Sequence, residues 1–290
     1  MLRLLDAAGF LDLLHGSPDA DAEELLGLWE GFYREKYPEL FRKQVEDYKL
    51  MGQDWKGIAR VRVFPGLATW LPVMEAARER LPRIWERVLK RAAGVLGFRD
   101  KVLGVIHVGI GCGAGWATDY EGKPAVLFGL EMIAELGWHT PERLEGLAAH
   151  ELGHVIHRAW RGEDIEPLEE RAAGLLYTEG FAQRLEGLIL GRESFHQAPS
   201  PEWITRCRKS LPEIAQAYLT RMNGGDVRGF FGSWFDYRGT KYTGYFLGYR
   251  FIRRLEGERS LREITHLSRK DIEEAARAFL REAAQGGETR

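Results

Sequence analysis

TPERLEGLAAHELGHVIHRAWR, residues 140–161, is the stretch that decides the architecture expected for this chain. Thr140 suits the N-cap of a helix, and Pro141 suits the first helical position. Beyond them, apolar residues recur at the spacing of one helix face: Leu144, Ala148, Leu152, Val155 and Ala159. The stretch therefore predicts a helix that begins near residue 140 and turns one face to the core.

The opposite side of this predicted helix carries His150, Glu151 and His154. Residues four apart on a helix stand almost above one another, about 6 Å apart along the axis. Two imidazoles at that offset can bind one metal ion, and Glu151 lies beside the remaining position of the metal. The pattern predicts two metal ligands and a general base. The alternative is a surface helix with two solvated histidines.

A catalytic zinc site usually needs a third protein ligand. His157 lies about 10 Å along the axis from the first histidine, too far to share one ion on a straight helix. We expect Glu179 instead, on a second helix over Pro167–Leu190, because a carboxylate on an apolar face is costly unless it is paired or binds a metal. The alternative is that Glu179 is exposed or pairs with an arginine such as Arg171 or Arg184.

HELGH at 150–154 followed by TEGFA at 178–182 resembles the motifs of the gluzincin metallopeptidases. The chain resembles still more closely a bacterial family of predicted zinc-dependent proteases, over Val102 to Phe251. Besides the two metal motifs, this likeness rests on residues 115–118, 125–131 and 244–249. The resemblance implies a zincin-like catalytic domain and one Zn²⁺ held by His150, His154 and Glu179.

It also implies a zinc-dependent peptidase that acts on a peptide or protein substrate through a metal-bound water activated by Glu151. Sites of this kind usually add a Tyr or His that stabilises the oxyanion. The run Gly-Tyr-x-x-Gly-Tyr at 244–249 points to Tyr245, and then to Tyr242. The alternative is that both are half-buried packing residues. We expect His196, in the loop before Pro199, to be a surface histidine.

Composition and charge favour an ordinary globular protein. The 290 residues are 44% hydrophobic and 29% charged, with a formal net charge of −2. No basic block suggests a nucleic acid partner, and no apolar run is long enough to span a membrane. Asp6 and Asp12 interrupt the apolar start, which favours a cytoplasmic location unless a leader has been removed. Cys112 and Cys207 are expected to be free thiols.

The expected fold class is α+β and mostly helical, in three segments. Residues 1–98 form a helical portion, residues 99–165 a small mixed β-sheet with the motif helix, and residues 166–290 a helical C-terminal lobe, which forms one zincin-like unit with the middle segment. Helices are expected over Asp21–Met51 and Ala68–Leu96, broken near Pro38, Pro72 and Pro82. Strands are expected over Ala59–Phe64, Lys101–Ile110, Trp116–Tyr120 and Ala125–Leu130.

Three other functions fit the same residues. The first is a zinc hydrolase of a non-peptide amide or ester, since the metal chemistry is the same. The second is an inactive zincin-fold protein that binds peptides. The third is a structural protein whose metal only fastens the fold, which would require a fourth protein ligand. An aminopeptidase would also need an acidic group for the substrate amine, for which Glu131 is a candidate. The sequence leaves the oligomeric state open, and His and carboxylate ligands also accept cobalt or manganese.

Overall fold

A computed structural model describes residues 4–234 and 236–286, except for the side chain of Glu166. The described chain is mostly helical and contains one mixed sheet of four strands, which confirms the expected α+β class. It divides into two compact units, Met1–Glu151 and Leu152–Arg290. The division falls inside helix α7 (Pro141–Arg161), the motif helix.

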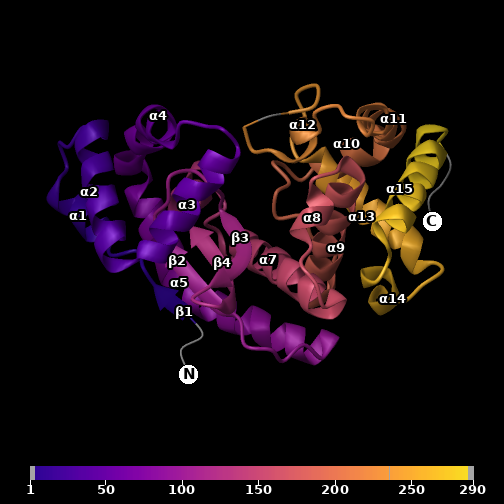
Figure 1. Cartoon of the computed structure of the whole chain (residues 1–290), viewed down its shortest axis with the longest axis horizontal. Coiled ribbons are helices and arrows are strands. Elements are labelled where there is room, and N and C mark those ends of the chain that lie inside the picture. The colour runs from indigo at the N-terminus through magenta and orange to yellow at the C-terminus, as the bar shows by residue number, and fades with distance from the viewer. Residues whose placement is uncertain (1–3, 235, 287–290) are drawn as a thin grey trace. The chain divides into compact units, whose positions relative to one another are not determined.

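The sheet of the first unit has the strand order β1-β2-β4-β3 (Figure 1). Its strands are β1 (Leu4–Asp6), β2 (Leu103–His107), β3 (Gly115–Tyr120) and β4 (Lys123–Gly129). β2 pairs in parallel with β1 and with β4, whereas β3 pairs antiparallel with β4 and forms an edge. The three strands expected in the middle segment are thus confirmed. β1 was not predicted, because three residues carry too little periodicity.

Besides its share of α7, the described part of the first unit contains seven helical elements: α1 (Phe10–Gly16), α2 (Ala22–Lys36), α3 (Pro38–Leu50), α4 (Trp55–Ile58), the π-helical turn η1 (Ala59–Val63), α5 (Phe64–Leu96) and α6 (Leu130–Glu135). The strand expected over Ala59–Phe64 is wrong. Ala59 and Val63 are buried and Val61 is 78% exposed. The sequence alternates apolar and charged residues, which suggested a strand, but the buried positions are four apart, which is the spacing of one helix face.

Two of the three expected helix breaks are also wrong. A new helix does begin at Pro38, but α5 runs unbroken through Pro72 and Pro82. Both prolines are exposed. The carbonyl groups that lose their intrahelical partner there can be solvated, while the opposite apolar face stays packed. That continuous buried face includes Met74, Ala77, Leu81, Trp85 and Val88.

In the described residues of the second unit, the named elements besides its share of α7 are helices. These are α8 (Glu166–Glu169), α9 (Ala172–Leu190), α10 (Trp203–Lys209), α11 (Leu211–Arg221), α12 (Arg228–Phe231), α13 (Thr243–Glu256), α14 (Leu261–Thr265) and α15 (Arg269–Ala284). The single helix expected over Pro167–Leu190 is interrupted at Arg171, whose backbone is extended. Cys112 and Cys207 are free thiols. No helix in the described residues combines the length and apolar character needed to cross a membrane.

Candidate metal centre

The motif helix α7 begins where the sequence predicts. The hydroxyl of Thr140 accepts a 3.4 Å hydrogen bond from the main-chain N–H of Arg143. The apolar stripe is buried from Leu144 to Val155. His150 and Glu151 are also buried, with fractional exposures of 3% and 9%. The helix therefore holds the side chains of His150 and Glu151 where solvent hardly reaches them.

Helix α9 brings Glu179 to His154. Oε2 of Glu179 lies 3.5 Å from Nε2 of His154, and the two side chains are only 16% and 12% exposed. Gly153 permits the close packing beside them, because a Cβ there would lie 3.0 Å from the backbone of Ala182 on α9. Two ligands of one tetrahedral zinc, with bonds of about 2.0–2.1 Å, lie about 3.4 Å apart. The observed separation fits that spacing.

His150, His154 and Glu179 together form one of two groups that could hold a metal ion, since their ligand atoms lie within 4.8 Å of one another. Two imidazoles and a carboxylate are a donor set that suits zinc. The two arginines considered as alternative partners of Glu179 have other carboxylates. Arg171 lies 3.5 Å from Glu273, and Arg184 lies 2.7 Å from Glu256.

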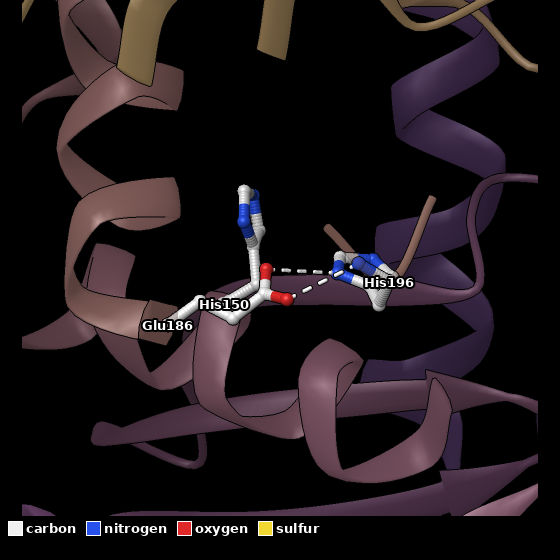
Figure 2. A group of neighbouring side chains, drawn as sticks. All are labelled: His150, Glu186 and His196. Carbon is white, nitrogen blue, oxygen red and sulfur yellow. Dashed lines mark hydrogen bonds and ion pairs between the residues drawn. The ribbon is translucent and has the colours of Figure 1, made fainter. Parts of the chain in front are cut away.

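A second group consists of His150, Glu186 and His196, all buried (Figure 2). The Glu186 carboxylate accepts 2.6 Å hydrogen bonds from the side chains of Ser194 and Gln183. It also accepts a 3.1 Å bond from the main-chain N–H of His196 and lies 3.0 Å from Nδ1 of that residue. Both oxygens of Glu186 are therefore already engaged.

These hydrogen bonds distinguish the two groups as metal sites. A metal on Glu186 would have to displace bonds that satisfy a buried carboxylate, and such displacement is costly. Glu179 is partly exposed and lies at ligand spacing from His154. Both groups offer two imidazoles and one carboxylate, and the feature that fits a metal ion in the first group is the spacing of Glu179 from His154. The pair Glu186–His196 is better suited to orient neighbouring side chains.

His157 and His196 are both buried, and the burial of neither was predicted from the sequence. His157 is fully buried, stacks on Phe181 at 4.2 Å and lies 3.2 Å from the Tyr177 hydroxyl. Burial lowers its pKa well below the usual range. It belongs to neither of the two groups that could hold a metal ion. The expectation that His196 is a surface histidine is wrong, since it is 6% exposed.

Sequence reasoning missed Glu186 as well as the burial of His196. One signal was present: α9 is apolar on nearly all sides, so that an interior carboxylate there requires a partner. Nothing local identifies that partner, because His196 lies in the loop that follows the helix. The charge of Glu179 also affects the pKa of a tyrosine on α11. Burial, and secondarily the charge of Glu179, raises the pKa of Tyr218 on α11 well above its usual value.

The predicted base, Glu151, contacts the edge strand of the first unit. Its Oε2 accepts a 3.1 Å hydrogen bond from the main-chain N–H of Ala117. A Cβ on Gly115 would lie 2.5 Å from Cγ of Glu151, so only glycine leaves room for this side chain. Glu151 therefore packs against β3. The hydrogen bond from Ala117 orients its carboxylate, and the absence of a side chain at Gly115 leaves the space that it fills.

The two tyrosines proposed from the resemblance lie at the start of α13. Tyr242 is the N-cap, with a left-handed backbone (φ 64°), and is 5% exposed. It therefore precedes the first turn of the helix. Tyr245 lies in the first turn, with its ring 6.1 Å from that of Tyr242 and edge-on to Phe231 at 5.4 Å. Both rings pack against aromatic neighbours.

Glu131, the candidate for binding a substrate amine, is 1% exposed. Its carboxylate accepts hydrogen bonds from the main-chain N–H groups of Gly109 (2.6 Å) and Gly111 (3.1 Å). A substrate amine would have to displace these bonds inside the core. Glu131 is therefore a structural carboxylate.

Comparisons of the chain with protein-family models, with curated proteins and with solved structures found no match. The gluzincin resemblance thus stays a prediction that rests on the motifs themselves.

Proposed function

We propose that this chain is a zinc-dependent peptidase of the gluzincin type, with a zincin-like catalytic domain. The observation that carries the proposal is the group of His150, His154 and Glu179, with Glu151 next to the first histidine on the same helix. The motifs HELGH and TEGFA support the same class. The ligand spacing of His154 and Glu179 adds a tertiary feature that the motifs alone do not contain.

His150, His154 and Glu179 would hold the ion, which when bound would polarise a substrate carbonyl and acidify water. Glu151 would accept the proton of the attacking water and deliver it to the leaving amine. The Ala117 N–H bond to Oε2 would keep this carboxylate in one orientation, with Oε1 as the proton-accepting oxygen. Tyr245 would donate a hydrogen bond to the developing oxyanion.

A peptide substrate is favoured over a non-peptide amide or ester by the edge strand. β3 is the outer strand of the described sheet, and the N–H of Ala117 points out of the sheet to Glu151. An extended peptide could pair with outward groups of this edge other than the Ala117 N–H, which stays bonded to Glu151, and the peptide backbone would then lie beside the base. A small ester has no extended peptide backbone that could pair with this edge.

The test combines elemental analysis of the purified protein with digestion of a broad peptide library, run beside Glu151→Gln. Stoichiometric zinc together with cleavage that the variant lacks is the expected result. Zinc with no peptide cleavage, but with turnover of amide or ester libraries, would favour the non-peptide hydrolase. Absence of stoichiometric metal would favour the inactive peptide-binding protein and contradict the proposal.

A further inference from the structure

The glycine-rich segment between β2 and β3, residues 108–114, closes around the side chain of Glu131. This residue lies in the first turn of α6 and is almost completely buried. Its carboxylate accepts the main-chain N–H groups of Gly109 and Gly111, as described above. Because two N–H groups two residues apart converge on one carboxylate, they fix the backbone conformation between them.

Helix α3 fixes the same segment from another direction. Oε1 of Gln44 accepts a 3.2 Å hydrogen bond from the N–H of Ile110, and the hydroxyl of Tyr48 donates a 2.8 Å bond to its carbonyl. A Cβ on Gly109 would lie 2.7 Å from Oε1 of Gln44, with the carboxylate of Glu131 also in contact. The segment therefore has one tightly enclosed conformation.

This segment leads directly into the strand that holds the base. The N–H of Gly129 donates a 3.1 Å hydrogen bond to the carbonyl of Ala114, and the β3–β4 register begins at Gly115. Two residues further on, the N–H of Ala117 reaches Glu151. A displacement of the segment at residues 109–111 would thus shift the start of β3 and the donor that orients Glu151.

We propose that Glu131 is a positioning residue for Glu151 and acts only through the backbone of residues 109–117. The inference rests on the proposed function, in which Glu151 is the general base. Glu131 is not in either group that could hold a metal ion, and its side chain is almost completely buried. Its role is to keep the Ala117 N–H where it can orient the base carboxylate.

Glu131→Gln in the full-length, metal-loaded protein tests this inference. Glutamine offers one acceptor oxygen, while its amide group would face the other backbone N–H, so that one of the two bonds is lost. We expect kcat for peptide cleavage to fall about tenfold, the equivalent of one ordinary hydrogen bond. KM and bound zinc should stay unchanged. Hydrogen exchange at the Ala117 amide should accelerate by about the same factor.

Ile272→Val is the matched control, because it opens a small cavity under α15, which belongs to the other compact unit and not to the unit that contains the segment. It should lower thermal stability while leaving kcat and the Ala117 exchange rate unchanged. If Glu131→Gln does not fold, Glu131→Asp, which keeps both oxygens on a shorter side chain, replaces it with the same expected effects.

Two outcomes are distinguishable. Wild-type cleavage with unchanged kcat and unchanged Ala117 exchange in the Glu131 variant would overturn the positioning role and leave the peptidase proposal intact. Absence of cleavage by the zinc-loaded wild-type protein would overturn the peptidase proposal instead. The exchange rate of Ala117 would then decide by itself whether Glu131 controls the contact with Glu151.

Discussion

Gly180 on α9 lies directly against Gly248 on α13. A Cβ on Gly180 would lie 2.8 Å from Cα of Gly248, and a Cβ on Gly248 would lie 2.6 Å from the carbonyl oxygen of Leu176. The two helices therefore cross with their backbones in contact. Because Glu179 immediately precedes this crossing, the position of its carboxylate depends on the distance between α9 and α13.

Gly180→Ala should separate the two helices and move Glu179. Overpacking of this kind costs about 1–3 kcal/mol of folding free energy, and the displaced ligand should weaken zinc binding. Calorimetric unfolding and zinc titration measure the two effects. Gly94→Ala in α5 is the control, since a Cβ there meets nothing within 4 Å. Unchanged zinc affinity in a destabilised Gly180→Ala protein would argue that Glu179 is not a ligand.

Glu151→Gln should retain stoichiometric zinc and lose turnover by about 10²–10⁴-fold, because the amide cannot accept a proton. The Ala117 N–H can still bond to the amide oxygen, so the fold should be unchanged. Zinc content and cleavage rates on one peptide measure the result. A variant that keeps full activity would show that Glu151 is not the base.

Glu179→Gln and Glu186→Gln distinguish the two possible metal groups. If His150, His154 and Glu179 bind the ion, Glu179→Gln should lose stoichiometric zinc. Glu186→Gln should keep zinc with an affinity about 10–100-fold lower, the usual cost of altering residues that orient a ligand. Competitive chelator titration measures both proteins. The reverse order of affinities would assign the metal to the group that contains Glu186 and His196.

Tyr245→Phe should lower kcat with little effect on KM if its hydroxyl stabilises the oxyanion. Loss of one such donor costs about 10²–10³-fold. Tyr242→Phe, at a buried N-cap, is the paired variant and should have the smaller effect. Steady-state kinetics on one peptide compares them. Wild-type kcat in Tyr245→Phe would leave this residue only its packing role against Phe231.

Folding stability should depend on pH through Glu131. Burial raises the pKa of its carboxyl from 4.5 to about 7, although the Gly109 and Gly111 N–H bonds oppose the shift. Because the folded pKa lies above the unfolded value, this contribution to stability is present below pH 4.5 and is lost as the pH rises through 7. The shift corresponds to about 3 kcal/mol.

Urea unfolding of wild type and Glu131→Gln at several pH values measures this contribution. The wild-type free energy of unfolding should fall relative to the variant between pH 4.5 and 8. Burial lowers the pKa of His107 to about 4, which has the opposite effect on stability over much of this range. Since both proteins contain His107, its contribution cancels in the difference. Parallel pH curves for the two proteins would contradict the assignment.

Helices with strong periodicity and clear end signals were predictable from the sequence. The Thr140–Pro141 start and the apolar stripe of α7 are local features, and α7 follows them. Pro72 and Pro82 show the limit of such reasoning. Whether a proline ends a helix depends on whether the freed carbonyls can be solvated, and that depends on which face the remainder of the fold covers.

By itself the sequence determined the mostly helical class, the motif helix and the placing of His150, Glu151 and His154 on it. These follow from spacing within one helix, where backbone geometry fixes which side chains are neighbours. Only the tertiary structure decided that Glu179 lies 3.5 Å from His154, that Glu186 pairs with His196, and that Ala117 holds Glu151. Such contacts join residues from different segments, between 10 and 34 positions apart in the chain. They depend on how buried surfaces pack, and a one-dimensional pattern does not contain that information.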